Sequence, residues 1–160
     1  VASNIGGSNE TIIDESLAIM IWSLKRFSHV NKQTHKWLDK SIYEPSMQLI
    51  HENDYSFKAL LDKYKYCTQS DEAISHRENA EWFLALLNDS LEKRFYLLGD
   101  ELTLADIAIF PFIRQFALVD YDWFLNSRYE ALVRWLQYLS KLDCFNRVML
   151  KQVVFRAAIG

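Results

Sequence analysis

Glycine, proline and cysteine are scarce in this sequence of 160 residues, which holds four glycines, two prolines and two cysteines. Average usage would give about 19 glycines and prolines together in a chain of this length. Because many-turned β-sandwiches and disordered segments are rich in these residues, the shortage argues against both and favours a helical protein. Half of the residues are hydrophobic, which suits one domain with a sizeable core.

Strong charge of one sign and long apolar runs are also missing. Eighteen basic and 21 acidic side chains give a net charge of −3, and no basic block is present, so we expect no nucleic acid as a partner. The longest apolar run, at 17–22, is far shorter than the roughly 20 residues that span a bilayer. We therefore expect no membrane partner and a cytoplasmic protein.

The cysteines and histidines form no recognised motif. Cys67 and Cys144 lie far apart and belong to no CxxC pair or Cys/His cluster, so neither a disulfide framework nor a zinc site is expected. The four histidines have no metal-ligand spacing such as HExxH, and no GxSxG motif or phosphate-binding glycine loop is present. We expect no metal, and hydrolase, metalloenzyme and kinase functions have no support.

Apolar residues recur at helical spacing along most of the chain. The spacing predicts helices at about 15–27, 38–65, 80–98, 102–119 and 129–136, and a short last one at 145–149. An interruption near 51–54 makes the second region either two helices in tandem or one bent helix. The polar stretch 28–36 is expected to be a connector, and no element is assigned to 1–9. Because 102–119 is apolar nearly all round, we expect it at the centre of an all-α bundle.

The start of this central helix carries a capping box. Thr103 is an N-cap whose hydroxyl can accept the amide of Asp106, while the Asp106 carboxylate can reach back to the amide of Thr103. Leu102 and Ile107 occupy the two positions of a hydrophobic staple. This structural role accounts for an acid in an apolar segment, so no catalytic role is assigned to Asp106. Pro111 lies inside the helix and is expected to bend it.

The stretch around the capping box, with the sequence YLLGDELTLADIAIFP at 96–111, resembles the start of the central helix in the C-terminal domain of the glutathione transferase superfamily. Shorter matches, similar to a bacterial branch of that superfamily, lie at 53–54, 57–58, 64–66, 112–117 and 135–136. The resemblance implies a helical bundle of the glutathione transferase C-terminal type over 28–160. It also implies that 1–27 are a lead-in and the last helix of a thioredoxin-like domain, which is otherwise absent from this sequence.

The segment IDESLAIM, at 13–20, resembles the Glu-Ser segment that opens the last helix of the family's thioredoxin-like domain. There the serine hydroxyl and the helix amides hold the γ-glutamyl carboxylate of glutathione, for which a helix N-terminus is physically suited. By this resemblance Glu15 and Ser16 are the remaining edge of a glutathione site.

The family's catalytic Tyr, Ser or Cys, and its cis-proline, belong to the part that this sequence lacks, so the resemblance assigns no catalytic residue here. Glutathione is then a co-substrate only where that part is present, this chain alone would bind it weakly, and no tightly bound cofactor is expected. Since the sequence begins with Val1 rather than methionine, we expect a start made by trimming or processing.

Polar and aromatic positions of the helical domain leave alternatives open. Arg114 and Gln115, on the buried central helix, either face the cleft toward the missing domain or take part in a buried ion pair with Asp120 or Asp122. Aromatic residues at helical spacing either line a hydrophobic substrate pocket or pack in the core, as aromatics usually do. The aromatic candidates are Tyr43, Trp82, Phe112, Phe116 and Trp123.

The resemblance implies a function, and the residues leave alternatives to it. In a glutathione transferase the helical domain supplies the hydrophobic co-substrate side of the cleft and much of the homodimer contact, and this chain alone would be inactive. The alternative is a stand-alone, non-catalytic helical module that binds a partner protein or a second copy through exposed apolar surface. A third interpretation is a glutathione-independent binder of small molecules that uses the half-cleft.

Overall fold

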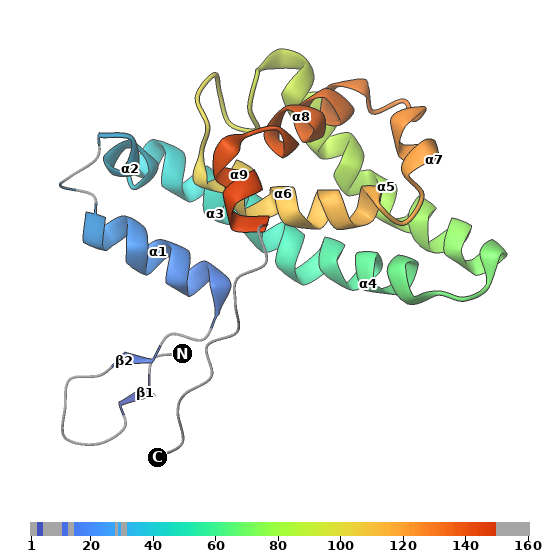
Figure 1. Ribbon diagram of the computed structural model, residues 1–160, viewed down its shortest axis with the longest axis horizontal. Coiled ribbons are helices and arrows are strands. Elements are labelled where there is room, and N and C mark those ends of the chain that lie inside the picture. Colours follow the sequence, from blue (N-terminus) through green and yellow to red (C-terminus); the bar gives the residue numbers. More distant parts are fainter. Residues whose placement is uncertain (1–2, 5–10, 13–14, 28, 30–31, 150–160) are drawn as a thin grey trace.

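The computed structural model describes residues 3–4, 11–12, 15–27, 29 and 32–149, which form an all-α bundle (Figure 1). Its helices are α1 (Ser16–Phe27), α2 (Lys32–Trp37), α3 (Lys40–Glu52), the π-helical segment η1 (Asn53–Phe57), α4 (Lys58–Tyr66), α5 (Ser70–Lys93), α6 (Leu104–Ala117), α7 (Tyr121–Leu125), α8 (Glu130–Ser140) and α9 (Asp143–Met149). Two strands of two residues each, β1 (Ser3–Asn4) and β2 (Thr11–Ile12), pair antiparallel ahead of α1. Among the described residues, no helix is both long enough and apolar enough to cross a membrane.

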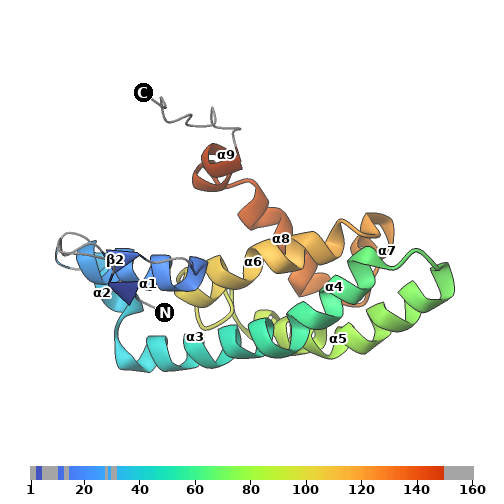
Figure 2. The ribbon, with the colours of Figure 1, turned by 90° about the horizontal axis from the view of Figure 1, so that it is seen from below.

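Helix α6 is the centre of the bundle, as its nearly continuous apolar sequence predicts. It packs against α3, α4 and α8, while α5 packs against α4 and α8. Figure 2 shows α3 and α4 following one another along one side of α6, with α1 and α2 at one end of the bundle and the turn between α4 and α5 at the other. Eight of the 14 residues of α6 are buried, so this helix provides the largest share of the core.

Aromatic rings join four elements inside this core. The ring of Phe57 in η1 lies 4.8 Å from that of Phe83 in α5 and 5.6 Å from that of Phe116 in α6, measured between centroids. The Tyr64 ring of α4 lies 4.9 Å from that of Phe116. Tilted pairs at these separations add about 0.5–1.5 kcal/mol each to the gain from burial, so they hold α4 and α5 on the central helix.

The region predicted at 38–65 is one helical rod rather than two separate helices. Helix α3 leads through η1 directly into α4, so the interruption near 51–54 is a π-helical turn and not a loop. A π-turn inserts one extra residue and so rotates the following side chains to a new face. It places Asn53 and Phe57 in the core.

Two short helices were not predicted. Helix α2 begins inside the expected connector 28–36 and ends at Trp37, and α7 forms where no helix was expected. Both are too short to show a period, and contacts outside the helical ladder stabilise them. Trp37 of α2 donates its indole N–H to the carbonyl of Leu102 at 2.7 Å, and the Asp120 carboxylate caps α7 by accepting the amide of Trp123 at 3.0 Å.

The start of α8 is capped from a distant helix. The side-chain oxygen of Asn88, in α5, accepts the amides of Ala131 and Leu132 at 3.1 and 3.2 Å. These two amides belong to the first turn of α8, where the helix itself offers no acceptor. Asn88 is 5% exposed, so a buried side chain of α5 fixes where α8 begins.

Candidate functional site

A groove of about 890 Å³ opens between α1, the rod formed by α3 and η1, and α6. Its wall is apolar and its rim is polar, which suits a ligand that is itself part apolar and part charged. The apolar wall consists of Leu17, Met20, Met47, Ile50, Ala108 and Phe112.

The π-helical turn supplies part of the polar rim. Asp54, Tyr55 and Lys58 face the groove from this turn and from the first residue of α4. The Tyr55 side chain is 76% exposed, and its ring lies 4.2 Å from that of His51. The Lys58 ammonium lies 5.2 Å from the centroid of the Phe112 ring, so a cation stands directly beside the apolar wall.

Glu15 and Ser16, the residues singled out in the sequence, both lie on this groove at the start of α1. The Glu15 carbonyl accepts the amide of Ile19 at 2.9 Å, so helical hydrogen bonding begins at Glu15. The amides of the first turn have no acceptor within the helix, and that turn contains no acidic residue. The start of α1 is therefore an exposed group of N–H donors at the positive end of a helix dipole, which favours a carboxylate.

Arg114 and Gln115 do not join Glu15 and Ser16. Gln115 accepts the ammonium of Lys65 at 2.9 Å on the surface. The Arg114 guanidinium lies 5.5 Å from the Phe145 ring and lines a separate cavity of about 400 Å³ beside α7 and α8.

The ion pair considered for Arg114 does not form within the described part of the chain. Asp120 instead lies 3.9 Å from Arg77, whose guanidinium also stacks 4.2 Å from the Trp123 ring. Arg114 thus neither lines the groove beside α1 nor forms an ion pair with a carboxylate of the described residues, and its guanidinium lies near the Phe145 ring.

Asp106 is fully buried and accepts four hydrogen bonds. One oxygen accepts the amide of Leu97 at 3.0 Å and the indole N–H of Trp135 at 2.9 Å, and the other accepts the amide and hydroxyl of Thr103 at 2.9 and 2.7 Å. Both reciprocal contacts of the capping box are present. Because all four donors are internal, the carboxylate is structural. Leu102 and Ile107 are both half-buried, and the contact between them stays a prediction.

Three tyrosines have raised pKa values, and none of them lines the groove. Burial, followed by a hydrogen bond with Tyr138, raises the pKa of Tyr96 to about 12. Burial also raises the pKa of Tyr64, against the opposing effect of Arg77. Burial and a hydrogen bond donated to Glu81 at 2.7 Å raise the pKa of Tyr129. Burial is the largest cause of all three shifts.

The aromatic candidates separate into one groove residue and several packing residues. Phe112 lines the groove, whereas Phe116 is buried in the core and Tyr43 packs against the core partly buried. The ring of Trp123 stacks against the Arg77 guanidinium, and Trp82 is 42% exposed. Sequence reasoning missed most of the groove residues, because the π-turn and the crossing of α3 with α6 bring them together. Among these are Met47, His51, Tyr55 and Lys58.

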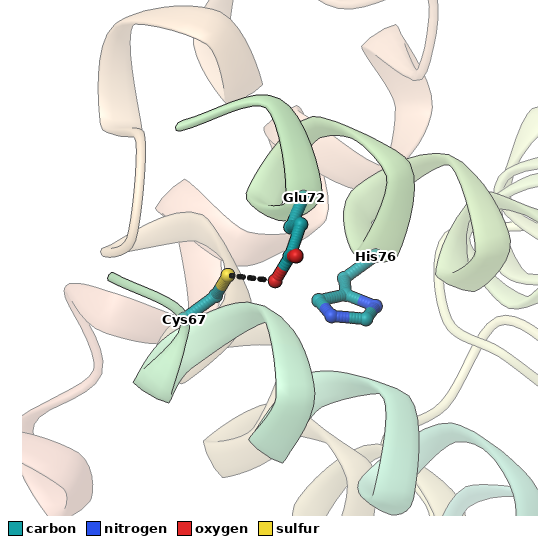
Figure 3. A group of neighbouring side chains, drawn as sticks. All are labelled: Cys67, Glu72 and His76. Atoms are coloured by element: carbon teal, nitrogen blue, oxygen red, sulfur yellow. Dashed lines mark hydrogen bonds between the residues drawn. The ribbon is translucent and has the colours of Figure 1, made fainter. Parts of the chain in front are cut away.

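The prediction that Cys67 belongs to no Cys/His cluster is wrong. Cys67 ends α4, and the short turn after it brings its sulfur next to Glu72 and His76 on the first turns of α5 (Figure 3). The spacing of these residues matches no common motif, so only the fold of the turn could reveal the cluster. Cys144 lies exposed in α9, away from this group.

The architecture defines the class of protein: an all-α domain built around a buried, capped central helix, with a groove beside its first helix. A family model described as "Glutathione S-transferase, C-terminal domain" matches residues 56–137, just over half of the chain. The chain belongs to this glutathione transferase family. A search of curated proteins finds no match.

Two solved structures have a similar fold. The first is a glutathione transferase family member from Pseudomonas fluorescens with two glutathione bound, which is 20% identical with a TM-score of 0.64 over 83% of this chain and 61% of its own. The second is glutathione transferase F2 from Populus trichocarpa, 17% identical with a TM-score of 0.69 over 89% of this chain and 71% of its own. At these identities the comparison establishes the fold, and this chain spans about three fifths of the length of the first structure.

Proposed function

We propose that this chain is the helical part of a glutathione transferase and that its groove holds a hydrophobic co-substrate beside glutathione. One observation carries the proposal: the exposed start of α1, with Glu15 and Ser16, faces the same groove as the apolar residues of α3 and α6. Membership of the family, and the two glutathione molecules in the relative from Pseudomonas fluorescens, support it.

The chemistry of the groove matches the parts of such a ligand. The Ser16 hydroxyl and the first amides of α1 would bind the γ-glutamyl carboxylate of glutathione. The carboxylates of Glu15 and Asp54, on the rim, would attract its ammonium group. Apolar side chains such as Met47 and Phe112 would contact the hydrophobic co-substrate, whose burial supplies the affinity.

Catalysis would need a group that lowers the pKa of the glutathione thiol, and we assign none of the described groove residues to that role. We therefore propose that the thioredoxin-like part of the whole protein supplies this group, in a cytoplasmic setting. This chain alone would bind glutathione weakly and would not accelerate conjugation. Conjugation by the pure chain above the uncatalysed rate would contradict that expectation.

Nuclear magnetic resonance of the labelled protein, titrated with glutathione and with S-hexylglutathione to millimolar concentration, tests the groove. We expect both ligands to shift groove resonances and S-hexylglutathione to bind more tightly, because its hexyl group reaches the apolar wall. Ser16→Ala should weaken both ligands several-fold. Phe112→Ala should weaken only S-hexylglutathione.

Ser70→Ala is the matched control, since Ser70 is also an exposed serine at the first position of a helix but lies outside the groove. It should leave both affinities unchanged. Absence of groove shifts, or equal effects of Ser16→Ala and Ser70→Ala, would contradict the proposal.

A second candidate function, a stand-alone module for protein interaction, rests on the exposed apolar side chains of α1. Ile19, Trp22 and Phe27 are 45%, 49% and 55% exposed, and exposed apolar surface commonly forms an interface. Light scattering after size-exclusion chromatography tests this. A homodimer that Trp22→Glu dissociates, with no glutathione binding in the groove, would favour the module, and groove binding of glutathione would favour the transferase.

A further inference from the structure

The turn between α4 and α5 gathers three different metal-binding side chains. The Cys67 sulfur lies 3.9 Å from the Glu72 carboxylate, and one ligand atom from each of Cys67, Glu72 and His76 lies within 4.8 Å of the other two. Figure 3 shows the three side chains converging on one another, with Cys67 at the end of α4 and the other two on α5.

We propose that this cluster is a zinc site that fastens the end of α4 to the start of α5. Thiolate, imidazole and carboxylate are the three side-chain donors that Zn²⁺ takes, and three protein ligands plus one water complete a tetrahedral shell. Mg²⁺ and Ca²⁺ prefer oxygen donors alone, so a thiolate and an imidazole select against them.

The local geometry fits such an ion with small movements. Zinc bonds of about 2.0–2.3 Å in a tetrahedron place ligand atoms about 3.3–3.8 Å apart, so donors that lie within 4.8 Å of one another must approach by at most about 1.5 Å. Glu72 and His76 are four residues apart on α5 and therefore project from the same face. All three side chains are surface residues that can turn, since Glu72 is exposed and Cys67 and His76 are half-buried.

The charge of the cluster also suits a divalent ion. On binding, Cys67 gives up its thiol proton to solvent, so that the thiolate, the Glu72 carboxylate and a neutral His76 balance two positive charges. The first turn of α5 contains Asp71 as well, which adds negative charge beside the site. These acids outweigh the positive end of the α5 dipole, which opposes a cation there.

The three donors have few competing partners. The Cys67 thiol donates to the carbonyl of Gln69 at 3.4 Å, a contact that a metal-bound thiolate would give up. The His76 ring makes no hydrogen bond or ion pair with any part of the chain that the structure describes. Binding therefore displaces little existing structure.

The site is separate from the groove. Cys67 follows Lys58, the last groove residue on the rod, by nine positions, which is about 13 Å along a helix. Figure 2 shows the α4–α5 turn at the end of the bundle away from α1, whose first residues line the groove. Zinc at this turn would therefore act on the stability of the α4–α5 corner, with no direct contact to a ligand in the groove.

Cobalt spectroscopy on the whole chain, freed of metal by a chelator and kept in buffer without thiols, tests the proposal. We expect one Co²⁺ per chain, with a thiolate-to-cobalt charge-transfer band that one equivalent of Zn²⁺ abolishes. Cys67→Ser should remove the band, and His76→Gln should weaken Co²⁺ binding by about tenfold or more.

Cys144→Ser and His35→Gln are the matched controls, because they change an exposed cysteine and an exposed histidine elsewhere. Both should keep the band and the affinity. As a second measurement, saturating Zn²⁺ should raise the midpoint of thermal unfolding of the wild type and of both controls but not that of Cys67→Ser.

The proposal is overturned if no charge-transfer band forms, if the band survives Cys67→Ser, or if Cys144→Ser removes it. Circular dichroism of each variant establishes that it is folded. Binding of glutathione in the groove is measured separately, so either proposal can fail without the other.

Discussion

The starts of α6 and α1 are two helix N-termini that the same chain uses in opposite ways. At α6 the first turn contains its own acid, Asp106, whose buried carboxylate takes two donors at the helix start and two from elsewhere in the core. At α1 the first turn has no acid, and Glu15 and Ser16 are exposed at the rim of a groove. The first start is closed by the protein itself, whereas at the second the first turn contains no acidic residue that could close it in the same way.

The two starts show that hydrogen-bond partners, rather than residue type, distinguish a structural polar residue from a candidate binding residue. A buried carboxylate with four internal donors has no capacity left for a substrate. An exposed helix start whose first turn contains no acid keeps its N–H donors and its dipole available. An acid in a capping motif is thus a poor guide to catalysis, whereas an exposed helix start beside an apolar wall is a useful guide to binding.

We expect the largest loss of stability when the carboxylate that closes the start of α6 is removed. Asp106→Ala leaves four buried hydrogen-bond donors without an acceptor. Each unpaired donor costs about 1–3 kcal/mol, so we expect a loss of at least about 4 kcal/mol in the free energy of unfolding. Urea denaturation measures it. Asp89→Ala, at an exposed position of α5, should change stability by less than about 0.5 kcal/mol. Equal effects of the two variants would remove the distinction between closed and open starts.

A third helix start, that of α8, sharpens the comparison because its cap comes from another helix. Asn88→Ala leaves the amides of Ala131 and Leu132 without an acceptor, and we expect a loss of about 2 kcal/mol. Asn88→Asp keeps an acceptor oxygen and should lose less. Urea denaturation measures the free energy of unfolding of both variants. Equal losses would mean that Asn88 acts through packing instead of capping.

Alkaline pH should lower the free energy of unfolding through Tyr96, which lies next to the start of α6. Tyr96 precedes Leu97, whose amide binds Asp106, and its pKa is about 12 against 10.0 for an ordinary tyrosine. The unfolded chain releases this proton first, so the stability that Tyr96 contributes is complete below pH 10 and is lost as the pH rises toward 12. The pKa values of Tyr64 and Tyr129 are raised as well, so they act in the same direction.

Urea midpoints across this pH range measure the effect. Tyr96→Phe should flatten only part of the decline, because the other two tyrosines remain. Since Tyr96 is half-exposed, we expect a smaller effect than those of the two substitutions above. A decline that is identical in wild type and variant would show that Tyr96 is not its source.

The smallest expected effect on stability is that of the open start. Ser16 is exposed, and its hydroxyl makes no hydrogen bond with the residues that the structure describes, so Ser16→Ala should change the free energy of unfolding by less than about 0.5 kcal/mol. Urea denaturation of this variant completes the series. A loss above 1 kcal/mol would mean that Ser16 stabilises the helix start and is no free ligand group.

The sequence predicts the parts of this fold that rest on local patterns. The apolar stretch at 102–119 indicates the buried central helix, and the spacing of Thr103 and Asp106 indicates its capping box, because both patterns lie within a few residues. The position of Ser16 at a helix start is equally local. The resemblance to the glutathione transferase family rests on these same stretches, and family membership is confirmed.

Features that depend on contacts between distant segments were beyond the sequence. The donors from Leu97 and Trp135 to Asp106 come from other elements, and so does the cap that Asn88 provides for α8. The π-turn that brings Tyr55 to the groove shows in the sequence only as an interruption near 51–54, which does not reveal the face that the following side chains take. The cluster around Cys67 depends in the same way on a turn between two helices.

The cap that Asn88 places on α8 also bears on the order in which the chain assembles. The contacts of Asp106 to Leu97 and Thr103 span at most nine residues, whereas Asn88 reaches residues 43 and 44 positions away. Closing a short loop costs less entropy, so we expect the segment from Leu97 to Asp106 to form early and α8 to dock late. Thr103→Ala should then slow folding, while Asn88→Ala should mainly speed unfolding. The hydrogen bonds to Asn88 that fix where α8 begins would then form late in folding and break early in unfolding.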